Sequence, residues 1–210
     1  MNPSPRATAA AVRESSPPMH DHARFLAAFV RRPFDTGAIT PSSTHLARVI
    51  VDQMGIAEAN TVVELGPGTG VFTKVIQDQL KPGARFLSFE INPDLAKTLS
   101  ARFPGVQVVN DSVENLAHHL KAAGRHEVDT TISGLPWAAF SPDRQRILLD
   151  AAVDALRPGG RFATFGYSHA AWLPTGRKFR ELLRSRFQHV ETSKVVWRNM
   201  PPAFVYRCRK

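Results

Sequence analysis

Short apolar runs alternate with amphipathic segments through most of the chain. The runs are typical of buried strands, and the amphipathic segments repeat their apolar positions with a helical period. Repeated strand–helix units predict an α/β fold, with a mostly parallel sheet and helices on both of its faces. Strands are predicted at residues 61–65, 85–90, 106–110, 128–133 and 161–167, and helices at residues 71–80, 93–102, 113–123, 142–156 and 179–187.

The end of the chain predicts a different kind of pairing. Residues 190–197 and 203–208 are rich in valine and aromatic residues and flank a turn that contains two prolines, so we expect a closing hairpin. The whole sheet is then expected to have seven strands, with an antiparallel strand at its C-terminal end. Sheets of this kind bind ligands beyond the carboxyl ends of their strands, near the point where the strand order reverses.

The N-terminal part carries no strand pattern. Residues 1–19 are rich in Pro, Ala and Ser, which predicts a disordered tail. Residues 20–58 predict N-terminal helices, and we expect residues 59–210 to form the main domain. The first helix, over residues 20–34, has an aromatic face surrounded by arginines, which is typical of a membrane interface, but a helix packed on the core would show the same pattern. The side chains expected to contact a membrane are Arg24, Phe25, Phe29, Arg31 and Arg32.

The net charge of +9 changes this picture because of where it lies. Residues 1–60 carry +1, residues 61–160 carry −1, and residues 161–210 carry +9, with 11 Lys/Arg against 2 acids. A basic surface of this kind favours an anionic partner, either nucleic acid or an acidic membrane, although a merely solvated face is the alternative. No apolar run approaches the ~20 residues that span a bilayer. The N-terminus shows no signal-peptide pattern, and the single cysteine, Cys208, suits a reducing compartment.

The most informative motif is V-V-E-L-G-P-G-T-G at residues 62–70. A strand, a tight glycine loop and a helix N-terminus together cradle nucleotide-like ligands. The loop lacks the Gly-Lys-Ser/Thr ending of a P-loop, and its spacing differs from the dinucleotide motif G-x-G-x-x-G. Glu64 at the strand end suits a cationic ligand better than a pyrophosphate. The motif E-x-G-x-G-x-G resembles motif I of the S-adenosylmethionine (SAM) methyltransferases, which implies a Rossmann-like class I methyltransferase fold.

Polar residues at the ends of the next strands support the same cofactor. Glu90 ends the second strand, where it can accept hydrogen bonds from both ribose hydroxyls. Asp111 follows the third strand and can accept from the adenine amine, and Ser133 ends the fourth strand, facing the transferred methyl group. The expected cofactor is SAM, with S-adenosylhomocysteine as product and no metal. The residues expected to bind it are Glu64, Gly66, Gly68, Gly70, Glu90, Ile91, Asp111, Ser112 and Ser133.

From residue 25 onward the chain resembles one family, the bacterial phospholipid N-methyltransferases. The resemblance rests on F-L-A-A-F-V-R-R-P-F-D-T-G-A-I-T-P-S-S, E-L-G-P-G-T-G, S-G-L-P-W and V-V-W-R-N-M-P-P-A-F-V-Y-R. It implies methylation of phosphatidylethanolamine towards phosphatidylcholine at the inner face of a bacterial membrane. It also implies a cytoplasmic, peripheral protein whose N-terminal amphipathic helix docks on anionic phospholipid. We expect a monomer that binds no nucleic acid.

The headgroup contacts are expected at the carboxyl edge of the sheet. Trp137 and Tyr167 could hold a methylated ammonium by cation–π attraction, with core packing as the alternative reading of both rings. Arg198 could bind the lipid phosphate, and Tyr167 or His169 could accept the amine proton. The full set of expected substrate contacts is Ser42, Ser43, Trp137, Tyr167, Arg198 and Asn199, with Tyr167 and His169 as the expected catalytic pair.

Two other functions stay open. The motif S-G-L-P-W is similar to the N-L-P-F/Y of ribosomal RNA adenine dimethyltransferases, although Ser133 replaces the asparagine and the C-terminal RNA-binding domain of that family has no counterpart here. A non-enzymatic module that binds membranes through a residual SAM fold is the second alternative. The intact acids Glu64, Glu90 and Asp111 argue against it.

Overall fold

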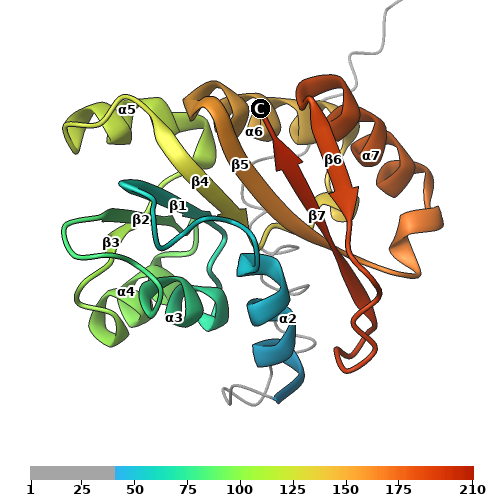
Figure 1. Ribbon diagram of the computed structural model, residues 1–210, viewed down its shortest axis with the longest axis horizontal. Coiled ribbons are helices and arrows are strands. Elements are labelled where there is room, and N and C mark those ends of the chain that lie inside the picture. The colour runs from blue at the N-terminus through green and yellow to red at the C-terminus, as the bar shows by residue number, and fades with distance from the viewer. Residues whose placement is uncertain (1–40) are drawn as a thin grey trace, which may run out of the picture.

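The structure is a computed structural model that describes residues 41–210, with side chains from Thr44 onward. Its centre is a seven-stranded sheet in the order β3-β2-β1-β4-β5-β7-β6, flanked by helices (Figure 1). The strands are β1 (Thr61–Leu65), β2 (Arg85–Phe89), β3 (Gln107–Val109), β4 (Val128–Ser133), β5 (Leu156–Tyr167), β6 (His189–Thr192) and β7 (Ala203–Arg209). The helices are α2 (Pro41–Val51), α3 (Val71–Gln77), α4 (Pro93–Arg102), α5 (Leu116–Ala122), α6 (Pro142–Ala155) and α7 (Pro174–Arg186). Three short 3-10 turns are η1 (Val113–Asn115), η2 (Trp137–Ala139) and η3 (Ala170–Trp172).

The strand directions confirm the predicted α/β topology. Strands β1 to β5 pair in parallel, and β7 then runs antiparallel between β5 and β6. The order reverses between β1 and β4, because the chain builds β2 and β3 on one side of β1 and later strands on the other. A ligand site is therefore expected beyond the carboxyl ends of β1 and β4.

Each face of the sheet has its own hydrophobic core. Val62 packs under α2, α3 and α4, whereas its neighbour Val63 packs under α5, α6 and α7, as the two-residue period of a strand requires. Leu46 and Ile50 of α2 are buried in the first of these cores. The predicted domain boundary after residue 58 therefore divides one hydrophobic core, because α2 lies before the boundary and contributes side chains to that core.

The largest difference from the predicted elements lies at the start of β5. Residues 157–160 (R-P-G-G) predict a turn, but β5 already begins at Leu156, which pairs with Val128 of β4. A register shift between Val128 and Thr130 accommodates the extra residues, and Arg157 forms an ion pair with Asp129 at 2.6 Å. A contact to a neighbouring strand overrides the local turn signal here.

Other bounds differ by a few residues. Helix α7 begins at Pro174 rather than at residue 179, because proline is well suited to the first turn of a helix. Strand β6 ends at Thr192, and beyond it Val196 forms an isolated bridge with Ala203. The segment predicted as one helix over residues 113–123 divides into η1 and α5.

The predicted membrane contacts Arg24, Phe25, Phe29, Arg31 and Arg32 lie outside the described residues. Ser42 and Ser43 lie in the first turn of α2, but their side chains also lie outside what the structure describes. Helix α2 ends near the amino end of β4, where the Met54 carbonyl accepts a hydrogen bond from Thr130 Oγ1 at 2.8 Å. Its N-terminus therefore lies towards the carboxyl edge of the sheet (Figure 1). Within residues 41–210, no helix has the length and apolarity needed to cross a bilayer.

Candidate active site

The glycine loop after β1 follows a path that glycine alone adopts readily. Gly66, Gly68 and Gly70 have φ angles of +68°, +55° and +83°. A Cβ on Gly66 would lie 2.7 Å from the Leu135 side chain, and one on Gly134 would lie 2.4 Å from the Gly66 carbonyl oxygen. The loops after β1 and β4 therefore touch backbone to backbone, and the positive φ angles explain why glycine occupies the three loop positions.

Glu64 lies between the sheet and α3 and is fully buried. Its Oε2 accepts hydrogen bonds from Thr73 Oγ1 and from Ser88 Oγ, both at 2.8 Å. Among the described residues its Oε1 has no hydrogen-bond partner. Burial raises the pKa of Glu64 to about 7, against the two hydroxyl donors that lower it. A buried carboxyl with one unused oxygen is suited to a site that attracts positive charge.

Glu90 joins the loops after β1 and β2. Its Oε2 accepts from the Gly68 N–H at 3.2 Å, and its Oε1 accepts from the Asn92 N–H at 2.9 Å. Burial raises the pKa of this carboxyl as well. Asn110 Nδ2 donates to the Glu90 carbonyl at 2.8 Å, which ties the loop after β3 to the same point. Because a carboxylate has about four acceptor sites, Glu90 retains the capacity to accept from ribose hydroxyls. Ile91 follows it, half-buried, in the same loop.

Asp111 is held in place by residues of η1 and α5, which follow it in the chain, and by the N–H of Ser112. Its Oδ1 accepts from Ser112 N–H at 2.6 Å and from Asn115 Nδ2 at 2.9 Å, and its Oδ2 lies 2.8 Å from His119 Nε2. Hydrogen bonds from His119 and Asn115 hold the pKa of Asp111 below its usual value, so the group is an anion at neutral pH.

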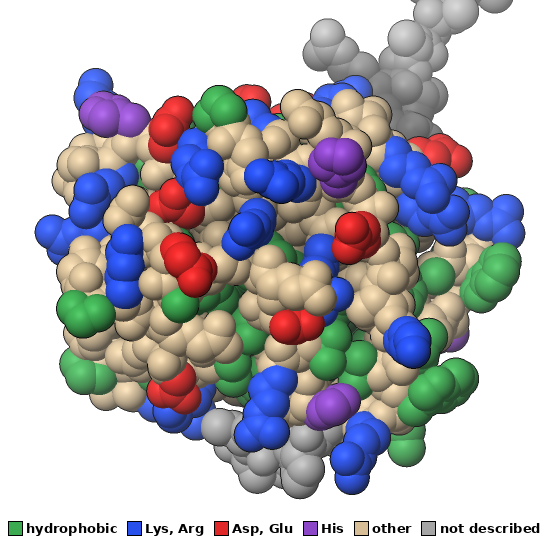
Figure 2. All heavy atoms as spheres, in the orientation of Figure 1, with side chains coloured by type: hydrophobic (Ala, Val, Ile, Leu, Met, Phe, Trp, Pro, Cys, Tyr) green, Lys and Arg blue, Asp and Glu red, His purple; other side chains and the backbone are tan. Residues whose placement is uncertain are grey.

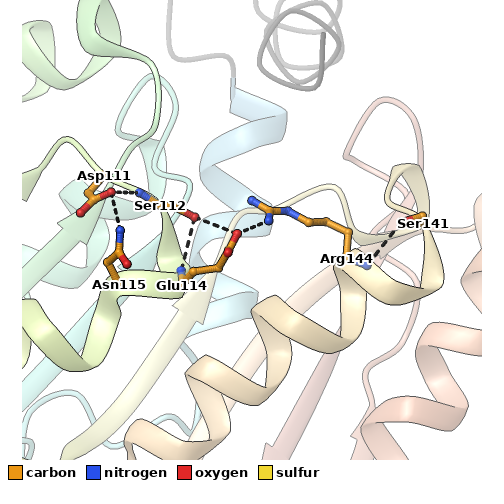
Figure 3. Close-up of polar contacts among 6 residues, drawn as sticks. All are labelled: Asp111, Ser112, Glu114, Asn115, Ser141 and Arg144. Atoms are coloured by element: carbon orange, nitrogen blue, oxygen red, sulfur yellow. Dashed lines mark hydrogen bonds and ion pairs between the residues drawn. The ribbon is translucent and has the colours of Figure 1, made fainter. Parts of the chain in front are cut away.

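Figure 3 shows this segment connected to the start of α6. Ser112 Oγ donates to Glu114, and Glu114 forms an ion pair with Arg144, whose own N–H is capped by Ser141 Oγ. The loops that follow β3 and β4 are thereby linked across the site.

Ser133 and Trp137 are both buried where β4 ends. Ser133 is fully buried, and its Oγ accepts from Trp137 Nε1 at 3.1 Å. The Trp137 ring is 2% exposed and stacks on Phe179 with centroids 4.6 Å apart. Because packing occupies this ring, the predicted cation–π contact with a substrate is wrong in this arrangement, and Trp137 is a core residue that shapes the turn after β4.

That turn is also held from outside. Gln145 of α6 is buried and donates to the Trp137 carbonyl at 2.8 Å, and Thr175 Oγ1 of α7 donates to the Ala138 carbonyl at 2.9 Å. The backbone of the S-G-L-P-W segment is thus fixed by two neighbouring helices.

Tyr167 and His169 follow β5 at the same edge of the sheet. Their rings are stacked, with centroids 5.8 Å apart and 12° between planes. Tyr167 is half-buried, which raises the pKa of its phenol, whereas His169 is exposed. The phenol is therefore neutral at physiological pH, so of the predicted catalytic pair only the imidazole is suited to accept a proton.

Arg198 and Asn199 lie in the connection between β6 and β7. Arg198 is exposed, so its guanidinium is accessible. Asn199 is 7% exposed, and its Nδ2 donates to the Pro201 carbonyl at 2.7 Å. The prediction that Asn199 contacts substrate is therefore wrong for this conformation, because its amide is used inside its own turn.

Sequence reasoning missed the partners of the acids. Ser88 could have been noticed in the sequence, because it is a polar residue between Leu87 and Phe89 of β2. It lies opposite Glu64 in the register of β1 and β2. Thr73 and His119 gave no such indication, because their contacts depend on how α3 and α5 pack.

The arrangement fits SAM by two observations. The glycine turn leaves no room for side chains at Gly66 and Gly134. The buried Glu64 lies two residues before this turn, and Glu90 accepts a hydrogen bond from Gly68 within it. The described residues contain no cluster of His, Cys, Asp or Glu that could hold a metal ion. Fold and site together define a class I SAM-dependent methyltransferase.

Comparison with known proteins narrows this class. Residues 40–115 match the ribosomal RNA adenine dimethylase family. An ornithine lipid N-methyltransferase from Singulisphaera acidiphila is 34% identical over 194 residues, which cover 91% of this chain and 97% of that protein. The ribosomal RNA small subunit methyltransferase A of Thermotoga petrophila is 29% identical over 115 residues, which cover 53% of this chain and only 41% of that protein.

Among solved structures, the 1,6-didemethyltoxoflavin-N1-methyltransferase of Burkholderia thailandensis superposes with a TM-score of 0.64 at 22% identity, covering 95% of this chain and 93% of that one. This likeness shows the fold. The near full-length match shows more: the chain belongs to the same family as the ornithine lipid N-methyltransferase.

Proposed function

We propose that this enzyme transfers methyl groups from SAM to the amine of a polar lipid headgroup at a membrane surface. The proposal rests on how much of the chain is matched by the lipid N-methyltransferase and how much by the ribosomal RNA family model. The lipid N-methyltransferase aligns over 91% of the chain, whereas the ribosomal RNA family model ends at residue 115, before the loops after β4 and β5. The part that the RNA family model matches runs from α2 to η1 and holds the expected cofactor residues Glu64, Glu90 and Asp111, so this match does not identify the acceptor.

Within lipids, two headgroups are candidates. The family resemblance favours phosphatidylethanolamine, and the relative's name favours an ornithine lipid. Both present an amine near the bilayer surface, and both are compatible with the basic C-terminal part of the chain. We place phosphatidylethanolamine first and treat the ornithine lipid as the direct competitor.

When bound, SAM supplies an electrophilic methyl group on a positively charged sulfur. The protein then has to orient the acceptor and accept a proton from its ammonium, because only a neutral amine has the lone pair that forms the new N–C bond. We assign the exposed His169 ring as the acceptor of this proton. The neutral Tyr167 ring, which stacks on His169, is assigned to hold the alkylated nitrogen by cation–π attraction. Arg198 is assigned to the lipid phosphate.

The assignment makes distinct predictions for each residue. His169→Gln should lower kcat, because the variant lacks the proton acceptor, and Tyr167→Phe should leave kcat nearly intact because the ring is retained. Methyl transfer from labelled SAM, measured separately on dispersed phosphatidylethanolamine, on ornithine lipid and on ribosomal RNA, tests the function itself. Labelled RNA with unlabelled lipid would reverse the proposal.

A further inference from the structure

Large apolar side chains are exposed at one end of the C-terminal part of the sheet. Trp172 is 76% exposed, Leu173 49%, Trp197 76% and Met200 80%. We call these residues the tryptophan edge. Isolated exposed apolar residues are ordinary, but a group of large ones marks an interaction site. Figure 2 shows exposed hydrophobic side chains among Lys and Arg on the side of the molecule that carries β6, β7 and α7.

The two segments that carry the tryptophan edge leave the sheet at the same place. Tyr167, the last residue of β5, pairs with Ala203, the first residue of β7. The Ser168 N–H donates to the Pro202 carbonyl at 2.9 Å, which joins the segment leading to Trp172 to the segment leading from Met200. This is the carboxyl end of β5, the edge where Tyr167 and His169 lie.

The connection between β6 and β7 is built to present its apolar residues outward. Val196 is buried and pairs with Ala203, and the polar Asn199 is also buried, with its amide on the Pro201 carbonyl. The neighbouring Trp197 and Met200 face solvent. This reverses the usual distribution, in which the amide is outside and the large apolar side chains are inside.

The two segments that carry the tryptophan edge contain charges of one sign only. Residues 161–180 and 192–210 contain no Asp or Glu. Lys194 and Arg198 flank Trp197, and Arg177 and Lys178 follow Leu173 at the start of α7. None of these four cations has an ion-pair partner among the described residues. Tryptophan beside unpaired Lys and Arg suits the headgroup region of an anionic bilayer, where rings lie at the acyl boundary and cations lie on phosphates.

We propose that the tryptophan edge inserts into the interface of an anionic phospholipid bilayer and brings the carboxyl edge of the sheet against the headgroups. The inference rests on the proposed function for its meaning, because a headgroup amine must reach the end of β5. It assigns bilayer contact to the folded domain itself, in addition to any contribution of residues 20–34.

The test uses the full chain and vesicles of phosphatidylethanolamine and phosphatidylglycerol. The variant W197S/M200S should float with vesicles on the order of tenfold less than wild type, and its methylation of vesicle lipid should fall in step. The matched control is Ile147→Ser, on α6, because Ile147 is also an exposed large apolar residue, at 45%, but lies outside the edge. It should float like wild type. Unchanged SAM binding by calorimetry shows that the variants are folded.

Tryptophan fluorescence locates the contact. The chain has three tryptophans, and Trp137 is buried in the core, so quenching by brominated lipids reports on Trp172 and Trp197. Quenching should be weaker in W172F than in wild type, and it should also be weaker in W197F. Equal flotation of W197S/M200S and wild type, or no quenching, overturns the inference.

A second copy of the chain is the other occupant to exclude. If wild type sediments as a dimer that W197S/M200S breaks, while flotation is unchanged, the edge is a protein interface and the inference is wrong. Failure of the proposed function looks different: wild type then methylates no lipid even when it is dispersed in detergent.

Discussion

At the scale of single residues, Glu64 is the most unusual group in the described chain. A carboxyl that is fully buried, with one oxygen lacking a partner, destabilises the folded state when it ionises. Thr73 from α3 and Ser88 from β2 donate to it, and the nearby Glu90 carboxyl raises its pKa further. Such local cost is common at sites where function, and not stability, selects the residue.

Substitution of Glu64 by Gln should therefore change the pH dependence of stability. The pKa of Glu64 is about 7 in the folded chain against 4.5 for the free group. Between these values the folded state binds more protons than the unfolded state, so the free energy of unfolding falls as pH rises. The loss is complete above about pH 7 and amounts to about 3 kcal/mol. Urea unfolding without SAM should show Glu64→Gln gaining stability relative to wild type between pH 5 and pH 8.

The exposed Glu58 offers a matched control for this experiment. Glu58→Gln controls for the loss of a carboxyl group that is exposed to solvent. The same pH slope for wild type and Glu64→Gln would contradict the burial cost assigned to Glu64.

The same ionisation should govern cofactor affinity. SAM is positively charged, and Glu64 becomes an anion only as pH rises through about 7. We expect calorimetry to show wild type binding SAM more tightly at pH 8 than at pH 6, because the charged carboxyl is already present at the higher pH. The rise should be smaller in Glu64→Gln, because the amide carries no charge at either pH. A rise of the same size in the variant would assign the effect to another group.

At the scale of elements, the turn after β4 is held by packing. Trp137 donates to Ser133, stacks on Phe179 and lies under α6 and α7. Trp137→Ala should lower the free energy of unfolding by about 3–5 kcal/mol through cavity formation. Trp137→Phe keeps most of the ring and loses one buried hydrogen bond, which is worth about 1–2 kcal/mol. Denaturant unfolding measures both. A Trp137→Phe variant of unchanged stability that has lost lipid methylation would restore the substrate-contact role.

The link between the loops after β3 and β4 contributes less to stability than the packing of Trp137. Glu114 and Arg144 form an ion pair across these loops, but their side chains are 39% and 32% exposed (Figure 3). Solvent screens a pair of this exposure. A double-mutant cycle with Glu114→Gln and Arg144→Gln should give a coupling energy below about 1 kcal/mol that shrinks further in high salt. A larger, salt-independent coupling would identify the link as a structural clamp.

The same scale shows what the sequence could predict. Strands β1 and β4 have the predicted bounds, because β-branched residues predominate in both. The acids at the strand ends could be placed at one edge, because parallel strands share a direction. The start of β5 was missed, because pairing between Leu156 and Val128 overrides a Pro-Gly-Gly turn signal. The positions of Trp137 and Asn199 were missed because burial of a ring or an amide is decided by neighbouring elements.

At the scale of the whole molecule, the basic charge is divided between structure and surface. Arg186 pairs with Asp150 at 2.7 Å, and Arg207 donates to the carbonyls of Val49 and Asp52. Lys194 and Arg198 have no such ion-pair partner among the described residues, and they lie beside the exposed Trp197. Part of the basic charge therefore lies exposed at the edge that also carries the proposed headgroup site.

Acceptor choice is the property that separates this enzyme from the RNA enzymes with which it shares its cofactor half. One competition reaction tests it: the full chain, labelled SAM, anionic vesicles containing phosphatidylethanolamine, and ribosomal RNA in the same tube, with both products separated and counted. We expect the label in mono- and dimethylated lipid and background counts in RNA. Replacing phosphatidylethanolamine by ornithine lipid decides between the two headgroups. Label in RNA, with none in either lipid, would contradict the assignment of a lipid acceptor.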